Sequence, residues 1–253
     1  MSEPRERTSS SPVAVVTGGA RRLGRHLCTA LAARGYDVVI LYRDSEADAR
    51  SLERQIADTG RRARALVVDV GANTQVAAVF ADIAAHEGRV DLLVNNVGNY
   101  NPQHVTKLDP SVWDATLATN LSGAYYCCFH ALALMGSGGS IVNIGMAGLE
   151  GIRANVHGAD YYVSKTGLLV LTRALAAAYA EKNIRVNMVS PGVTETESIA
   201  HAPERLRRVQ AMQTPLRRLA SPEDIAEAVV ALCSEAGEFV TGVDVPVCGG
   251  IRM

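Results

Sequence analysis

The chain has 253 residues, of which 48% are hydrophobic, so it can bury a substantial core. Its formal net charge of −1 excludes a global field that would draw it to nucleic acid or to an anionic membrane. No apolar run is long enough to span a bilayer, which argues against a membrane protein.

Residues 1–12 are polar and charged and end in proline, so we expect a disordered tail rather than a secretory signal. The five cysteines include no CxxC pair, which favours a reduced, cytoplasmic protein. The six histidines show none of the spacings of zinc ligands, so the sequence predicts no metal site.

Short runs rich in β-branched residues alternate with longer amphipathic segments along the rest of the chain. We predict strands over residues 13–17, 37–42, 64–70, 91–96, 140–145, 184–190 and 243–247. We predict helices from the first glycine turn to residue 34 and over residues 45–59, 73–87, 111–134, 159–181 and 222–234. Strict alternation is typical of a doubly wound α/β fold of the Rossmann type, with a parallel sheet covered on both faces. No segment looks like a linker, so we expect one domain over residues 13–253.

The first predicted strand leads directly into the glycine-rich turn TGGARRLG at residues 17–24. Gly18 permits a tight turn, and Gly24 lets the following helix pack closely on the strand. The exposed N–H groups at the start of that helix can hold a pyrophosphate. We therefore predict a nucleotide site that includes Gly18, Arg21, Arg22, Leu23 and Gly24.

The end of the second predicted strand indicates which nucleotide binds. A carboxylate there would select NAD by accepting hydrogen bonds from the ribose, but this chain has Tyr42, Arg43, Asp44 and Ser45. Arg43 can clamp a 2′-phosphate, and Arg22 brings a second cation, so the pair favours NADP. Asp44 leaves an alternative open, because it could turn inward and reach the ribose.

These residues resemble a classical short-chain dehydrogenase/reductase from about residue 13 to the C-terminus. The matching segments, in order, are TGGARRLG (17–24), Asp69, NNVG (95–98), ATNLSG (118–123), YYVSK (161–165), RVNMVSPG (185–192) and VTGVDVPVCGG (240–250). The resemblance implies a seven-stranded parallel sheet, a nicotinamide cofactor and usually a homotetramer. The TGxxxRxG turn, with Arg22 where glycine is commoner, is similar to that of pteridine reductases.

The resemblance also implies a general acid/base, the tyrosine of a Y-x-x-x-K motif. Helical spacing alone allows Tyr161 or Tyr162 to meet Lys165, and the family motif selects Tyr161. A free phenol has a pKa of roughly 10, and we expect the Lys165 ammonium to lower that of Tyr161. The family further implies that Lys165 bonds the nicotinamide ribose and that Asn120 holds a water behind it.

The serine that donates a hydrogen bond to the substrate carbonyl in this family is missing. Met146 takes its place, and a thioether cannot donate. His157 and Asp160 are nearby, but we interpret them as a loop residue and a helix-start residue. A cationic iminium substrate would need no such donor, and Tyr161 alone could serve a ketone.

The remaining expectations from the resemblance concern the rest of the cofactor and the substrate. Asp69 and Val70 should lie by the adenine, and Asn96, Val97 and Gly98 should line its far side. Pro191, Gly192, Val193 and Thr194 should meet the nicotinamide. The substrate candidates are Tyr100, Met146, His157 and Tyr162, together with a substrate loop over residues 194–214 that contains a lid helix at 204–213.

Three functions remain open at this point. The leading one is an NADPH-dependent reductase of a carbonyl or imine group on a small molecule, in specialised-metabolite biosynthesis. The second is a pteridine or dihydrofolate-type reductase, and the third is a low-turnover nucleotide-binding regulatory subunit. We expect a homotetramer, with the outward faces of helices 111–134 and 159–181, including Leu168, Leu171 and Leu175, buried between copies.

Overall fold

The computed structural model describes residues 11–149, 151, 155–195 and 203–251. Within them, all the strands run parallel in one seven-stranded sheet of order β3-β2-β1-β4-β5-β6-β7. The strands are β1 (Val13–Thr17), β2 (Asp37–Tyr42), β3 (Ala63–Val67), β4 (Leu92–Asn95), β5 (Ser140–Ile144), β6 (Arg185–Pro191) and β7 (Asp244–Val247). The predicted fold class is confirmed, although β3 ends three residues earlier than expected.

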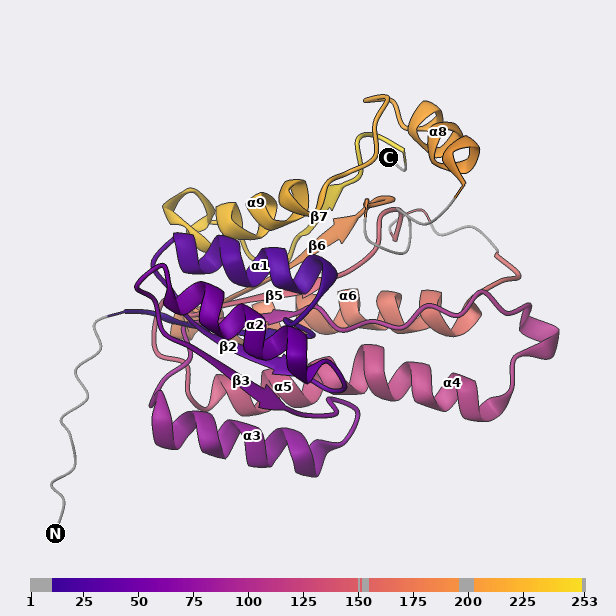
Figure 1. The fold of residues 1–253 in the computed structure, drawn as a ribbon. Coiled ribbons are helices and arrows are strands. Elements are labelled where there is room, and N and C mark those ends of the chain that lie inside the picture. Colours follow the sequence, from indigo (N-terminus) through magenta and orange to yellow (C-terminus); the bar gives the residue numbers. More distant parts are fainter. Residues whose placement is uncertain (1–10, 150, 152–154, 196–202, 252–253) are drawn as a thin grey trace, which may run out of the picture.

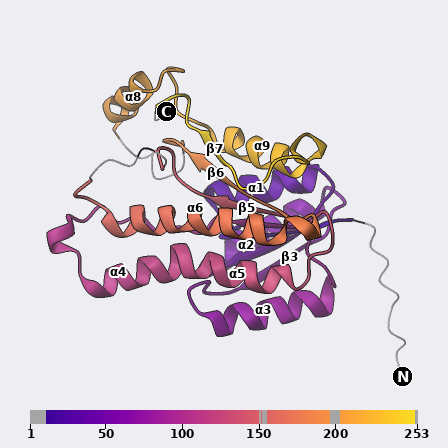
Figure 2. The same cartoon turned by 180° about the vertical axis from the view of Figure 1, so that it is seen from behind.

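Helices cover both faces of the sheet, as Figures 1 and 2 show from opposite sides. One face carries α1 (Arg22–Ala33), α2 (Glu46–Ala57) and α9 (Pro222–Cys233). The other carries α3 (Asn73–His86), α4 (Pro110–Leu117), the π-helix η2 (Ala118–Ser122), α5 (Gly123–Leu132) and α6 (Ala159–Tyr179). The short 3₁₀ helices are η1 (Val105–Lys107), η3 (Ala180–Lys182) and η4 (Glu235–Gly237), and α8 (Glu204–Gln213) stands apart from the layers.

Two apolar cores form because every central strand buries side chains on both faces. Alternate β1 residues point to opposite sides: Ala14 and Val16 meet the α1–α2–α9 layer, and Val13 and Val15 meet the other layer. Strands buried in this way read as continuous apolar runs, which is why the sequence located them closely.

The chain enters the sheet two residues before β1. Residues 1–10 of the predicted tail lie outside the described residues. Pro12, which we had assigned to that tail, accepts a backbone hydrogen bond from Asp37 at 2.8 Å, and the Ser11 hydroxyl accepts one from Arg61 at 3.1 Å. The ordered domain therefore begins by residue 11 rather than at residue 13.

The predicted helix 111–134 is interrupted in the structure. It consists of α4, one π-helical turn at Ala118–Ser122 and α5, with Asn120 buried in the π turn. A π turn inserts one extra residue into a helix and often marks a functional site.

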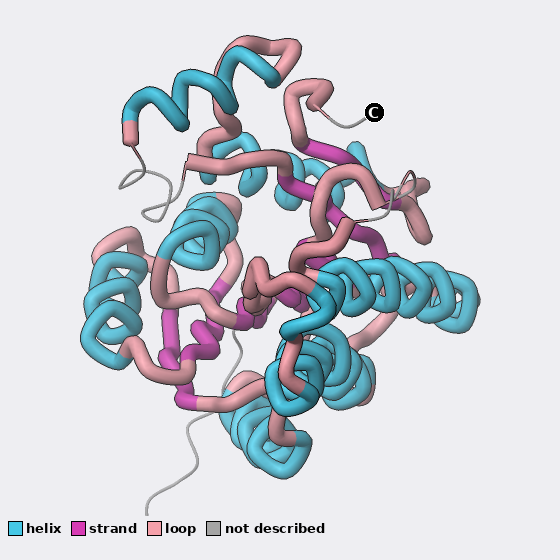
Figure 3. The backbone as a smooth tube through the Cα atoms, turned by 90° about the vertical axis from the view of Figure 1, so that its right-hand side faces the viewer, coloured by secondary structure: helices cyan, strands magenta, loops and turns pink. Residues whose placement is uncertain are grey.

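The strand order reverses between β1 and β4, and in doubly wound sheets this is where ligands bind, at the carboxyl edge. The two strand ends are joined there, because the Thr17 hydroxyl accepts hydrogen bonds from the backbone N–H groups of Asn96 (2.9 Å) and Val97 (3.2 Å). Figure 3 looks onto this edge, where the loops that follow the strands gather.

In the described part of the chain, no helix combines the length and apolar character needed to cross a membrane.

Candidate active site

A cavity of about 380 Å³ opens at the β1–β4 edge. It brings together every cofactor residue that the sequence predicts between positions 18 and 98: Gly18, Arg21, Arg22, Leu23, Gly24, Tyr42, Arg43, Ser45, Asp69, Val70, Asn96, Val97 and Gly98. The cavity is also lined by Asp44, which the sequence analysis left open, and by five residues that it did not assign there: Ala20, Leu41, Val68, Asn99 and Thr119. Asn99 and Thr119 adjoin the predicted residues Gly98 and Asn120 in the sequence, so the same motifs could have identified them.

The glycine turn fits a dinucleotide pyrophosphate. Gly18 has φ +61°, a conformation that favours glycine, and a Cβ on Gly24 would overlap the Gly18 carbonyl oxygen. The turn therefore lies tightly against the first turn of α1, whose residues Arg22, Leu23 and Gly24 line the cavity. The first N–H groups of a helix have no partner within the helix and can bind an anion. Among the described residues, no side chain caps this helix start, so an anion is a suitable partner for it.

Cationic side chains line the part of the cavity next to β2. Arg43 bonds the neighbouring Asp44 carboxylate through Nε at 2.8 Å, so Asp44 pairs with an arginine in the protein alone. Arg22 has φ +51°, a left-handed conformation unusual for a residue with a side chain. Arginines at these positions can form charge-assisted hydrogen bonds to a phosphate group.

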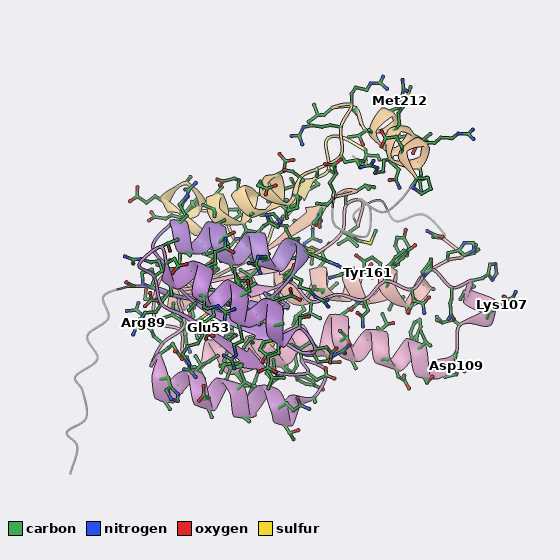
Figure 4. The ribbon with its side chains drawn as sticks, in the orientation of Figure 1. Glu53, Arg89, Lys107, Asp109, Tyr161 and Met212 are labelled. Carbon is green, nitrogen blue, oxygen red and sulfur yellow. The ribbon has the colours of Figure 1, made fainter. Side chains whose placement is uncertain are left out.

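Lys165 lies buried behind the cavity, with only 2% of its surface exposed. Its Nζ donates to the Ile144 carbonyl oxygen at 2.7 Å and lies 5.9 Å from the centroid of the Tyr161 ring. A Cβ on Gly98 would come within 3.2 Å of that Nζ, so the cavity lining and Lys165 adjoin one another. Figure 4 shows Tyr161 at the start of α6, on the side of the molecule that carries Met212 of α8.

The two candidate proton carriers have opposite pKa shifts. Burial lowers the pKa of Lys165 to about 8. Burial, followed by the neighbouring phenols of Tyr162 and Tyr100, raises the pKa of Tyr161 to about 12. We expected Lys165 to lower the pKa of Tyr161, and in the protein alone the effect of burial is larger. Tyr161 is therefore a neutral phenol that can donate a proton.

Asn120 ties the loop after β4 to α6. Its Nδ2 donates to the Asn99 carbonyl oxygen at 2.9 Å and to the Ser164 hydroxyl at 3.1 Å, and its Oδ1 accepts from the Asn99 N–H at 2.7 Å. Ser164 in turn donates to the Tyr161 carbonyl oxygen at 2.7 Å. Asn120 thus reaches the backbone of Tyr161 through one side chain, Ser164, that the sequence analysis did not identify.

Two of the predicted substrate residues flank Tyr161. The Tyr100 ring lies edge-on to it with centroids 5.0 Å apart, and the Tyr162 ring follows at 6.2 Å. Met146 packs against a small apolar cluster on the same face of the sheet as α6. His157 instead faces His104 across an isolated antiparallel bridge, with ring centroids 5.3 Å apart.

The predicted nicotinamide residues Pro191, Gly192, Val193 and Thr194 are not among those that line the cavity. They continue from β6 beside the segment after β5, since the Ala147 N–H donates to the Pro191 carbonyl oxygen at 3.0 Å. Of the predicted substrate loop, residues 196–202 lie outside the described residues, and the predicted lid helix 204–213 matches α8.

As for metals, no group of three or more histidine, cysteine, aspartate or glutamate side chains within the described ranges could hold an ion.

Comparisons with known proteins agree with this arrangement. Residues 18–252 match the family model described as enoyl-(acyl carrier protein) reductase. The chain is similar to cis-4-hydroxycyclohexanecarboxylate dehydrogenase of Sinomonas cyclohexanicum, with 37% identity over 94% of this chain and 95% of that protein. It is also similar to the 3-oxoacyl-(acyl-carrier-protein) reductase of Staphylococcus aureus, with 30% identity over 95% and 98%.

Among solved structures, the chain resembles a short-chain dehydrogenase from Burkholderia cenocepacia in complex with NADP. The TM-score is 0.89 and the identity 29%, over 95% of this chain and 97% of that one.

Proposed function

The chain belongs to the short-chain dehydrogenase/reductase family of oxidoreductases, and on that premise we propose that it is an NADP-dependent reductase of a carbonyl group on a small molecule. The observation that carries the proposal is the neutral Tyr161 phenol beside the buried Lys165, next to a cavity that has a dinucleotide cradle and arginines. Membership of an enzyme family also argues against the low-turnover binding subunit.

Arg22, Arg43 and Ser45 would hold the 2′-phosphate of NADP, and the glycine turn its pyrophosphate. When bound there, NADPH would supply the hydride that reduces the carbonyl carbon. Tyr161 gives its phenolic proton to the carbonyl oxygen as the alcohol forms, and the phenolate regains a proton from water. Lys165, whose Nζ lies 5.9 Å from the centroid of the Tyr161 ring, would bond the nicotinamide ribose. Asn120 holds the start of α6 through its bond to Ser164.

The relatives favour a carbonyl over an imine. One is named for a cyclic hydroxy acid and the other for a 3-oxoacyl group, so both act on an alcohol–ketone pair. At 37% identity, the hydroxycyclohexanecarboxylate dehydrogenase supports an alicyclic ketone as the substrate class. An imine and a pterin remain less supported alternatives, because the pteridine likeness is confined to the Arg22 turn.

A panel of cyclic ketones, cyclic imines and dihydropterins, monitored through NADPH absorbance, tests this function. We expect turnover of a ketone by the wild type and a loss of at least about 100-fold in Tyr161→Phe, the range of a lost general acid. A preformed iminium needs no proton for hydride transfer. Undiminished turnover in Tyr161→Phe would therefore contradict the carbonyl assignment.

A further inference from the structure

Within the described residues 144–149, the segment after β5 offers no side-chain hydrogen-bond donor for the substrate oxygen. Residues 144–149 are Ile-Gly-Met-Ala-Gly-Leu, without a hydroxyl or amide side chain. Met146 packs there against the cluster formed by Ala124, Leu149, Leu168, Leu169 and Met188. A reductase of a neutral ketone gains on the order of 10²–10³ in kcat from such a donor, so another group is expected to supply it.

The helix α6 turns the side that carries both phenols toward this segment. Leu168 and Leu169 come seven residues after Tyr161 and Tyr162, so each lies on nearly the same face of the helix as its phenol, and both belong to the Met146 cluster. The other side of Tyr161 faces α4 and η2, because Asp160 bonds Thr116 and Ser164 bonds Asn120. Tyr162 is therefore a second phenol, beside Tyr161, on the side of α6 that faces the segment without a donor.

The Tyr162 hydroxyl is held with its proton available. Asn155 Nδ2 donates to the Tyr162 oxygen at 2.9 Å, so in this bond the phenol acts as an acceptor. A phenol that accepts one hydrogen bond still has its own O–H to donate. The Tyr162 ring stands at 84° to that of Tyr161, with centroids 6.2 Å apart, so the two phenols are neighbours at the start of α6.

We propose that Tyr162 donates the second hydrogen bond to the substrate oxygen, in place of the donor absent at Met146, and that Asn155 positions its phenol. The assignment rests on the proposed function, because the oxygen concerned is that of the carbonyl being reduced. Tyr161 transfers its proton to this oxygen, whereas Tyr162 keeps its proton and stabilises the negative charge that develops during hydride transfer.

The test begins with the wild type on the ketone panel, followed by Tyr162→Phe. We expect kcat to fall by about 100-fold, as for the loss of one oxyanion donor, with the Kd for NADPH unchanged. Tyr179→Phe removes a phenol from the far end of α6 and should leave kcat within about three-fold of the wild type. NADPH binding shows that each variant is folded.

A rescue experiment separates hydrogen bonding from packing. In the Tyr162→Phe background, Met146→Ser returns a hydroxyl to the segment and should recover at least about ten-fold of the lost kcat. In the wild type the same substitution should raise kcat by a smaller factor than in Tyr162→Phe, because the donor is already present. Asn155→Ala should lower kcat in the wild type and have no further effect in Tyr162→Phe, as expected for a residue that acts through Tyr162.

One competing donor is Ser190, at the end of β6. Its hydroxyl is buried without a hydrogen-bond partner among the described residues and lies where a Cβ on Gly145 would meet it. A loss of kcat in Ser190→Ala together with unchanged kcat in Tyr162→Phe would overturn the proposal in favour of Ser190. Equal gains from Met146→Ser in both backgrounds would also overturn it. Failure of the wild type to reduce any ketone would refute the proposed function itself, and this is seen before any variant is compared.

Discussion

Among single residues, Lys165 combines complete burial with a positive charge in the candidate site. Burial lowers its pKa to about 8, from 10.5 in an exposed lysine. Between these two values the unfolded chain binds a proton that the folded chain lacks, so this residue makes the free energy of unfolding rise with pH. Below pH 8 both states are protonated, and the folded protein bears the full cost of the buried charge.

Lys165→Met should remove this pH dependence. The wild-type free energy of unfolding minus that of the variant should rise by about 2 kcal/mol between pH 8 and pH 10, because each pKa unit corresponds to about 1.4 kcal/mol. Urea denaturation at a series of pH values measures the difference. Lys107→Met, at an exposed lysine, is the control and should give a flat difference. A flat difference for Lys165→Met as well would contradict the buried-charge assignment.

The left-handed conformation of Arg22 allows its effect on stability to be separated from its effect on cofactor binding. Glycine adopts φ +51° without the strain that a side chain brings, so Arg22→Gly should leave the free energy of unfolding unchanged or raise it by less than about 1 kcal/mol. The same change removes a cation from the 2′-phosphate site, so the Kd for NADPH should rise at least about ten-fold and that for NADH little. Fluorescence titration of both cofactors measures this. A parallel loss of NADH affinity would show that Arg22 acts through the shape of the turn instead.

Between elements, a polar contact joins α4 to α6. The Thr116 hydroxyl donates to Asp160 Oδ2 at 2.6 Å, and both side chains are buried. The other carboxylate oxygen of Asp160, Oδ1, is buried without a hydrogen-bond partner among the described residues. The contact lies one helical turn from the Asn120–Ser164 bond, so it helps to hold the start of α6 on which Tyr161 stands.

Thr116→Val keeps the shape of this contact but removes its donor. The buried Asp160 carboxylate is then left without its hydroxyl partner, and we expect the free energy of unfolding to fall by about 2–3 kcal/mol. Thr74→Val, at an exposed position on α3, should change it by no more than about 0.5 kcal/mol. Urea denaturation compares both variants with the wild type, and equal effects at the two positions would exclude a special role for the contact.

The sequence predicted the elements closely where one local signal decides the structure. The strands β1 and β2 match their predicted bounds, because both are interior strands of the sheet with buried and mostly apolar side chains. The π turn at Ala118–Ser122 was not predictable, because it depends on the bonds that Asn120 makes to Asn99 and Ser164 after folding. The cavity residues followed from motifs, whereas the Asn155–Tyr162 bond brings a loop onto a helix and has no periodic signal.

For the whole molecule, the outward face of the α5–α6 layer differs from the one that the sequence suggested. Leu168 was expected to point outward, but it is 1% exposed and belongs to the core, while Leu171 and Leu175 are half-buried. The exposed apolar side chains here are Tyr125 and Phe129 on α5 and Val163 and Val170 on α6. Figure 2 shows α5 and α6 lying along the same side of the molecule. A second copy of the chain would cover this surface.

We predict that the protein assembles as a homotetramer in which this α5–α6 surface is one of the interfaces, because an apolar face left in water favours association and closed assemblies use self-complementary faces. Light scattering of the wild type should return a mass close to four times the 26.8 kDa of one chain. Val170→Glu places a charge on the proposed interface and should lower that mass. Val67→Glu is a matched control, since Val67 and Val170 are both 63% exposed but Val67 lies on the edge strand β3. A wild type that is monomeric would refute the assembly, and equal dissociation by both variants would place the interface elsewhere.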